Sequence, residues 1–326
     1  MGIKYLNRYL KNNCKKGIEN ISIDKLRGKT IVIDTSIYIY KFLEENALLE
    51  NFFVLITSFR EYEITPLFIL DGKADVSKMD LLWKRVHKKR DALKEFHVLK
   101  ERIEAGGVRS LCEKKQLLGK MEALRKKSTR IQEQDLAELK QLFDAMGVFY
   151  HTAEKEADIV CAHFVKKGLA WGCMSDDMDM FVYGCDIVLR EWNMKQSTGM
   201  LYRLDTIMKE VRVEPEHFSR LLLLMGSDYN QEKENVNVYT AFKWYDEYMA
   251  VAANDDVGFY LWLQNTQKIS SENAVKLDTI FNNMYNSFPT TIYFQPSPLT
   301  VVNWREIKKL MAPYGFVIAM TSETTQ

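Results

Sequence analysis

The sequence predicts an α/β protein whose mostly parallel, twisted sheet is flanked by helices. Three short apolar runs are typical of buried strands, and acidic residues follow each of them at once. Segments with helical patterning separate these runs along the chain. Such alternation favours a parallel sheet, because a parallel connection needs a crossover and a helix usually supplies it.

The first two strands are predicted in the amino-terminal quarter of the chain. The β-branched run at 30–33 ends at Asp34, and the pattern after it predicts a helix over 36–45. A second apolar run, at 67–70, is followed by Asp71 and a glycine turn. Both strands are therefore expected to present a carboxylate at their carboxyl end.

The third strand follows a long helical stretch. A highly charged helical region is predicted over 78–146, with a turn or hinge where two glycines stand at 106–107. A helix over 153–167 then leads to the third strand, within 169–174, and to the acidic segment Ser-Asp-Asp-Met-Asp. A short apolar helix closed by Gly226 comes next.

The composition is that of an ordinary globular protein. The chain has 326 residues, of which 47% are apolar and 27% charged, enough for one large domain or two smaller ones. No apolar run approaches 18 residues, so no membrane span is expected. The five cysteines form no C-x-x-C pair, which favours an intracellular, reducing compartment over a disulfide framework or a zinc site.

The charge is distributed unevenly along the chain. Residues 84–130 hold sixteen Lys or Arg against six Asp or Glu, an excess of ten. Because the whole chain carries +1, the remainder carries about −9. A cationic segment of this kind predicts a polyanionic partner.

The acids that follow the strands predict a metal site. The carboxyl ends of parallel strands meet at one edge of a sheet, where ligands of such proteins bind. Singly, each acid also fits an ordinary helix cap or turn. Several carboxylates within about 5 Å of one another, however, cannot all stay ionised without cations. Oxygen ligands suit Mg²⁺, so a pair of divalent ions is predicted, as two-metal hydrolysis of a phosphodiester would require.

Six motifs then occur in an order that resembles a known family. They are MGI..L at the amino terminus, IVIDTSIYIYKFL, FILDGK, EKEAD, SDDMDMFVYG and LLLLMGSDY. With them the chain is similar to the flap endonuclease/XPG group of structure-specific 5′ nucleases. The resemblance implies a PIN-like 5′ nuclease fold with a core at 1–230, a basic helical arch at about 78–130, and a helical C-terminal region at 231–326.

The resemblance also implies roles for individual residues. The metal-binding carboxylates would be Asp34, Asp71, Glu154, Glu156, Asp177, Asp179 and Asp228. The basic pair that faces the scissile phosphate would be Lys78 and Arg85, and the nucleotide beside the cut would stack on Tyr40. Further DNA contacts are expected from Lys84, Lys88, Lys89 and Arg90. By the same pattern Asp176 is a neighbour of the ligands and not a ligand itself.

The arch carries two further expectations. Leu82, Val86 and Leu93 are predicted to form the apolar stripe of its first helix. Because its excess positive charges repel one another, we expect the arch to be mobile in the free protein and ordered by DNA.

The chain departs from the family pattern in its carboxyl-terminal third. After GSDY the text NQEKENVNVYTAFKWY has no glycine, so a helix–two-turn–helix there would be degenerate and its potassium site is in question. The segment between Asp34 and Asp71 is short for a pocket that reads a 3′ flap. The carboxyl terminus shows no sliding-clamp-binding box, and a last helix is predicted over 304–311.

The function expected from these observations is a Mg²⁺-dependent 5′ nuclease, a flap endonuclease with 5′→3′ exonuclease activity, in which Mn²⁺ can replace Mg²⁺. Its partner would be branched, nicked or flapped DNA, bound by a monomer, in the nucleus or at a viral replication site rather than the cytoplasm. Two alternatives remain open at this stage: a module that binds DNA junctions with little cleavage, and a 5′→3′ exoribonuclease.

Overall fold

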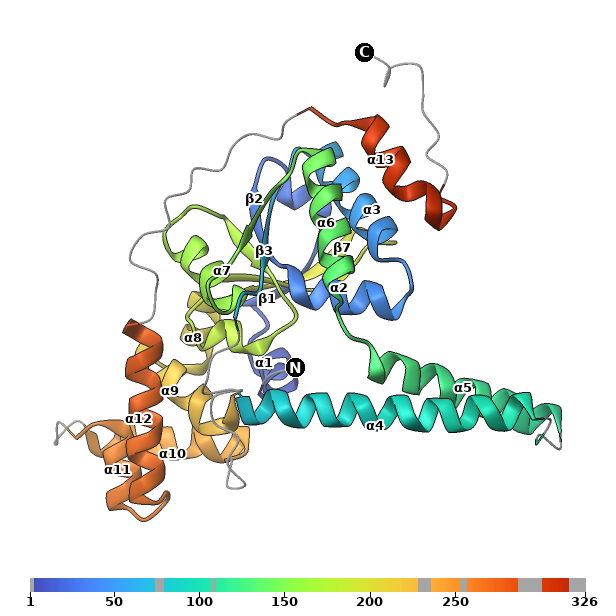
Figure 1. Ribbon diagram of the computed structural model, residues 1–326. Helices are drawn as coiled ribbons and strands as arrows, with labels where there is room; N and C mark the ends of the chain where they lie inside the picture. Colours follow the sequence, from blue (N-terminus) through green and yellow to red (C-terminus); the bar gives the residue numbers. More distant parts are fainter. Residues whose placement is uncertain are drawn as a thin grey trace. The chain divides into compact units, whose positions relative to one another are not determined.

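The computed structural model describes residues 3–73, 79–105, 107, 110–227, 236–252, 257–286 and 301–316 (Figure 1). The chain forms two compact units, each assembled from three separate stretches. Unit 1 consists of Met1–Thr35, Thr57–Lys73 and Val148–Leu299, and unit 2 of Ser36–Ile56, Ala74–Gly147 and Thr300–Gln326. The division at residue 230 that the sequence suggests stays a prediction.

Unit 1 contains a seven-stranded sheet of order β1-β7-β6-β5-β2-β3-β4. Its strands are β1 (Ile18–Ser22), β2 (Thr30–Asp34), β3 (Thr65–Leu70), β4 (Phe149–Thr152), β5 (Gly172–Met174), β6 (Ile187–Asn193) and β7 (Thr198–Arg203). Neighbours from β6 to β4 pair in parallel, whereas β7 is antiparallel to both β6 and β1. The predicted mostly parallel sheet is confirmed.

The central strands have the composition that a buried parallel strand requires. Ile31, Val32 and Ile33 of β2 are fully buried, as are Leu67, Phe68 and Ile69 of β3. An apolar residue at every position, rather than at alternate ones, is expected where both faces of a strand are covered.

The helices of unit 1 follow the strands or extend beyond the sheet. They are α1 (Leu6–Asn13), α7 (Ala157–Lys166), α8 (Leu204–Val211), α9 (Pro215–Gly226), α10 (Val238–Ala252), α11 (Phe259–Asn265) and α12 (Ser271–Asn286), with short 3₁₀ turns η1 (Ile23–Leu26) and η3 (Met178–Phe181). The expected end of α9 at Gly226 is confirmed.

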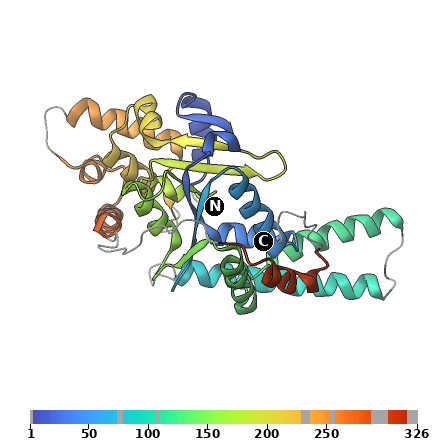
Figure 2. The same ribbon diagram turned by 90° about the horizontal axis from the view of Figure 1, so that it is seen from above.

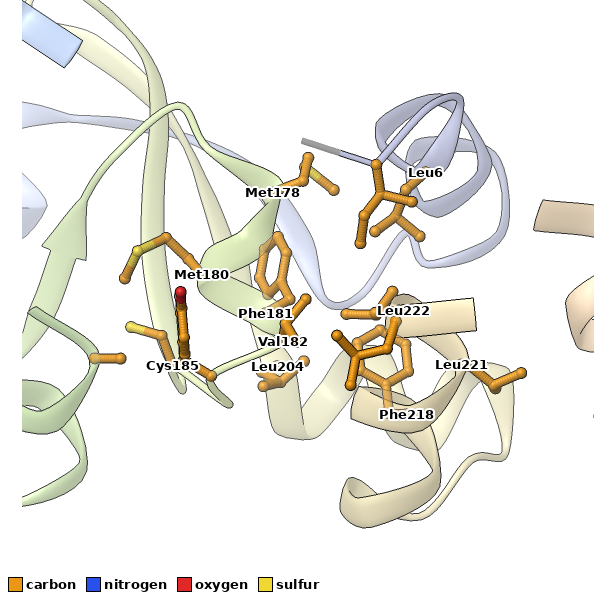
Figure 3. Close-up of a cluster of buried hydrophobic side chains, with 14 of the residues drawn as sticks. Leu6, Met178, Met180, Phe181, Val182, Cys185, Leu204, Phe218, Leu221 and Leu222 are labelled. Atoms are coloured by element: carbon orange, nitrogen blue, oxygen red, sulfur yellow. The ribbon is translucent and has the colours of Figure 1, made fainter. Parts of the chain in front are cut away.

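An apolar cluster joins three of these helices to η3, the turn at whose start the aspartates lie. Leu6 of α1, Phe181 of η3, Leu204 of α8, and Phe218 and Leu222 of α9 are almost completely buried in one core cluster (Figure 3). Full burial of each such side chain contributes roughly 1.5–3 kcal/mol. The cluster therefore anchors η3, and with it the acidic residues at the start of η3.

All secondary structure that is described in unit 2 is helical. Its helices are α2 (Thr35–Glu44), most of α3 (Leu48–Glu61), α4 (Met79–Glu104), α5 (Leu111–Ser128), α6 (Glu133–Met146), α13 (Trp304–Met311) and the 3₁₀ turn η4 (Ala312–Tyr314). The helices predicted over 36–45 and 304–311 are confirmed. None of the described helices of the protein combines the length and apolar character needed to cross a membrane.

Helices α4 and α5 run side by side as a hairpin, as both views show (Figure 1 and Figure 2). The hairpin has a small core of its own, in which Ala92, Leu99 and Leu124 are buried. The predicted break is confirmed, since α4 ends at Glu104 and α5 begins at Leu111. The mobility expected of the hairpin stays a prediction.

The apolar stripe predicted for α4 is wrong. Val86 and Leu93 are exposed and Leu82 is only half-buried, whereas Ala92 and Leu99, with the half-buried Phe96, face α5. The helix carries two apolar faces, and helical periodicity alone does not tell which of them a partner covers.

Candidate metal centre

Acidic side chains gather where four neighbouring parallel strands end. Asp34 is the last residue of β2, and Asp71 directly follows β3. Because β5, β2, β3 and β4 are adjacent and parallel, their carboxyl ends share one edge of the sheet. We call the acids at this edge the acid edge: Asp34, Asp71, Glu154, Glu156, Asp177 and Asp179.

Asp34 is the most strongly perturbed member of the acid edge. Its side chain is 6% exposed, and its Oδ2 accepts a hydrogen bond of 2.9 Å from Ser175 Oγ. Burial raises the pKa of Asp34 to about 8, and the charges of Asp71, Asp177 and Asp176 act in the same direction. The hydrogen bond from Ser175 opposes this shift only in part. A cation beside Asp34 would remove the cost of ionising it.

Asp71 is held against the start of α7. Its Oδ1 accepts a hydrogen bond of 2.8 Å from Ala157 N, in the first turn of that helix. The next residue must be glycine, because a Cβ on Gly72 would lie 1.9 Å from Ala153 O. This close approach brings the segment after β3 against the segment that carries Glu154 and Glu156.

The glutamates do not lie where the sequence indicates. Helix α7 was predicted from 153, but it begins at Ala157, so Glu154 precedes the helix and Glu156 is its N-cap. The reason is tertiary: Gly72 N donates to Lys155 O at 2.6 Å, which holds that segment in an extended link. Glu154 is exposed and Glu156 half-buried.

Asp177 and Asp179 are ordered by a local network. Asp177 is the N-cap of η3, and its Oδ1 accepts a hydrogen bond of 3.0 Å from Asp179 N. Asp177 N in turn donates to Ser175 Oγ, at 3.2 Å. Ser175 therefore contacts both Asp34 and this segment, and Asp179 is only 2% exposed.

Asp176 faces the neighbouring strand. Its Oδ1 accepts a hydrogen bond of 2.6 Å from Glu191 N of β6. This contact occupies one of its carboxylate oxygens with the main chain of the sheet. Its role as a neighbour rather than a ligand stays a prediction that this geometry supports.

Arg190 is a supporting residue that sequence reasoning missed. Its side chain is 6% exposed, donates to Asp176 O at 2.6 Å, and contacts Met178 Sδ. A buried guanidinium thus braces the segment between β5 and η3 and adds positive charge near the acids. The available signal was an arginine inside the apolar strand sequence IVLREW, since Arg is almost never fully buried unless paired.

The donor set of the acid edge suits hard divalent cations. It offers carboxylate oxygens only, which Mg²⁺ prefers over sulfur or nitrogen. Among the described residues, no three acidic, histidine or cysteine side chains are close enough together to hold an ion by themselves. Mg²⁺ commonly keeps several waters and binds substrate phosphate oxygens in addition to one or two carboxylates, so an open set of this kind fits it.

The predicted cationic contacts lie in unit 2. Lys84, Lys88 and Arg90 are exposed on the first half of α4, and Arg85 is half-buried there. Lys89 Nζ lies 4.1 Å from the centre of the half-buried Tyr40 ring, a cation–π contact that joins α4 to α2. Lys78 and Asp228 lie outside the described residues.

Comparison with known protein families identifies the group. Residues 1–92 match the XPG N-terminal domain, and residues 147–228 match the XPG I-region. Flap endonuclease 1 of Encephalitozoon cuniculi is 30% identical over 246 residues, which cover 70% of this chain and 68% of that protein. The chain belongs to the flap endonuclease/XPG family, as its motifs indicate.

Other relatives and solved structures agree with this assignment. Flap endonuclease 1 of Cryptosporidium parvum is 28% identical over 282 residues, and the chain spans 54% of its length. The catalytic core of Rad2 in complex with DNA substrate superposes with a TM-score of 0.67 at 17% identity, covering 96% of this chain and 95% of that one. Flap endonuclease-1 from Methanococcus jannaschii gives 0.61 at 18% identity, covering 96% and 93%. At such identities the structures show a shared fold.

Proposed function

We propose that this protein is a Mg²⁺-dependent, structure-specific 5′ nuclease that hydrolyses phosphodiesters in flapped, nicked or branched DNA, with 5′→3′ exonuclease activity. One observation carries the proposal: the ends of four adjacent parallel strands bring six carboxylates to one edge, with Asp34 buried among them. The relatives named flap endonuclease 1 support the cleavage of flaps, and the Rad2 catalytic core, solved in complex with DNA substrate, supports the choice of DNA. So does the cationic helix α4.

The acid edge, together with Asp228, would hold two divalent ions, and Mn²⁺ would replace Mg²⁺. When bound, such ions supply an activated water and neutralise charge on the phosphate. The chain orients this set through main-chain bonds, from Ala157 N to Asp71 and from Asp179 N to Asp177. The apolar cluster behind η3 limits movement of the acids.

The remaining residues would act on the DNA. Arg85 and Lys78 would offset negative charge that develops on the phosphate oxygens. The nucleotide beside the cut would stack on Tyr40, and Lys84, Lys88, Lys89 and Arg90 would contact phosphates. The products would carry a 5′-phosphate and a 3′-hydroxyl. We propose that a monomer acts in this way, in the nucleus or at a viral replication site.

The test is cleavage of a 5′-flap oligonucleotide with Mg²⁺ by the Asp177→Asn/Asp179→Asn double variant. We expect cleavage to fall at least about 1,000-fold, because the ions lose two charged ligands, while DNA binding in EDTA changes little. Asp205→Asn, an exposed acid 3.4 Å from Lys209 on α8, is the matched control and should cleave normally. Normal cleavage by the double variant would disprove the metal assignment, and a matched RNA substrate separates deoxyribonuclease from ribonuclease activity.

A further inference from the structure

Helix α4 carries an apolar face that its hairpin partner leaves uncovered. Met79 is 54% exposed, Trp83 66% and Val86 49%, and all three lie on the side of α4 away from Ala92 and Leu99. Of the six tryptophans in the chain, Trp192 is 3% exposed and the other four are half-buried. Trp83 is therefore the one exposed tryptophan of the six, all of which lie in the described part of the chain.

The Trp83 side chain lies against a second ring of its own helix, that of His87. The rings of Trp83 and His87, one turn apart, have centroids 3.6 Å apart with an angle of 35° between their planes. His87 Nδ1 also lies 3.0 Å from Trp83 O. These contacts restrict the rotamers of both rings, so the pair presents an ordered aromatic surface at a reduced entropic cost.

The cations around this pair differ from those at the far end of the hairpin. Within the described part of the chain, Lys84, Lys88 and Arg90 make no ion pair. Farther along, Lys100 pairs with Glu104, Arg102 with Glu113 at 2.6 Å, and Lys120 with Glu95 at 2.6 Å. Among the described residues of α4, the cations that have carboxylate partners are thus in its second half, whereas these three cations of its first half have none.

We propose that Trp83 and His87 form a stacking platform for the bases of a single-stranded DNA segment, whose phosphates contact Lys84, Lys88 and Arg90. Exposed aromatic rings interleaved with cations are what sequence-tolerant binding of single strands requires, because every base offers a flat apolar face and every nucleotide a charge. Duplex DNA hides its bases and would engage the cations alone. The inference rests on the proposed function for the identity of the polyanion.

The test distinguishes the contribution of the bases to binding from that of the phosphates. The probes are one duplex with a 5′ overhang of ten thymidines, the same duplex with ten abasic residues, and the blunt duplex, all in EDTA so that nothing is cleaved. We expect Trp83→Ala to weaken binding of the thymidine overhang about tenfold and to leave the abasic and blunt probes unchanged. Trp83→Phe should restore part of the affinity. Val98→Ala, at a 62% exposed position on the same helix, is the matched control.

Fluorescence gives a second reading on the same samples. The thymidine overhang should quench tryptophan emission of the wild type, and Trp83→Phe should remove that quenching. If Trp83→Ala loses affinity equally for the thymidine and abasic overhangs, or loses none, the stacking platform is disproved, even if the protein cleaves flaps normally. In that case the face would be free for another partner, such as a protein. Failure of the wild type to bind any of the probes would overturn the proposed function as well.

Discussion

The acid edge and the cationic half of α4 each concentrate charge of one sign, but they hold their charged side chains in different ways. At the acid edge, the aspartates are buried or held by short hydrogen bonds, as with Asp34 beside Ser175 Oγ and Asp71 beside Ala157 N. On α4, long side chains such as Lys84 and Lys88 are exposed on a helix surface. The first arrangement places oxygens within narrow limits, as a small ion requires, whereas the second tolerates a chain of phosphates at variable positions.

Among single changes on α4, the largest effect should come from Arg85, which departs from this division. Arg85 lies on α4, yet we expect it to act on transition-state charge as the acid edge does. Arg85→Ala should lower the single-turnover cleavage rate about 100-fold and change DNA affinity less than about threefold. Lys94→Ala, an exposed cation two turns or so farther along, is the control. If Arg85→Ala weakens binding and leaves the rate intact, its catalytic assignment is wrong.

A smaller effect should separate the two ends of the hairpin. Replacing Lys88, Lys89 and Arg90 with Ala should weaken DNA binding about tenfold at moderate salt and reduce the salt slope by roughly 2 to 3, because each lost phosphate contact removes about 0.7 to 0.9. The single-turnover rate at saturation should hardly change. Titration against salt concentration measures both quantities.

The control for this variant is a second triple change at the paired end: Lys100, Arg102 and Lys120 to Ala. Those side chains already have carboxylate partners. Their loss should alter the slope by less than 1. If the two triple variants show the same salt slope of DNA binding, the two ends of the hairpin do not differ in their phosphate contacts.

The smallest effect concerns stability at the acid edge without metal. The pKa of Asp34 rises from 3.8 to about 8 on folding. Between these values the folded state binds more protons than the unfolded state, so the free energy of unfolding falls as pH rises from about 4 to about 8. Asp34→Asn removes this cost and can still accept from Ser175. In EDTA at pH 7.5 it should be more stable than the wild type by on the order of 1–3 kcal/mol.

Denaturant unfolding at pH 4.5 and pH 7.5 tests this sign. The advantage of Asp34→Asn should disappear at the lower pH, where the wild-type carboxyl is protonated in the folded state. Added Mg²⁺ should stabilise the wild type more than the variant. If Asp34→Asn is less stable than the wild type at pH 7.5 in EDTA, then ionisation of the buried Asp34 carboxyl does not destabilise the folded protein, and the proposal is wrong.

Three of the seven strands, β2, β3 and β5, could be predicted from the sequence, because each is an apolar run followed at once by acids, whereas β1, β6 and β7 carry no such signal. The edge strand β4 could not, since its four residues are only partly buried and owe their conformation to pairing with β3. The sequence predicts too early a start for α7 for a related reason. Glu and Lys favour a helix locally, but the bond from Gly72 N to Lys155 O overrides that preference.

The residues of the candidate site likewise fall into those that the local sequence predicts and those that depend on tertiary contacts. The acids at the strand ends can be predicted from the sequence, because they directly follow apolar runs. Two other features depend on tertiary contacts that the sequence does not reveal. The contact of Arg190 with the 175–179 segment requires that β6 lies beside that segment. The exposure of Trp83 follows from the packing of α5 against the opposite face of α4. A periodic pattern offers both faces of α4 as candidates for burial, and only the complementary side chains of α5 select one.

The pairing of β1 with β7 has a consequence for how the protein is made. Ile18 lies opposite Tyr202, so the first strand finds its partner only after about 180 further residues have been synthesised. At roughly 5–20 residues per second, the ribosome needs on the order of 10–40 s for that distance. Ile18 and Ile21, both buried in the finished sheet, stay without their partner strand throughout this interval. We therefore expect the nascent segment around β1 to need shielding during synthesis, as a chaperone that binds short apolar segments provides.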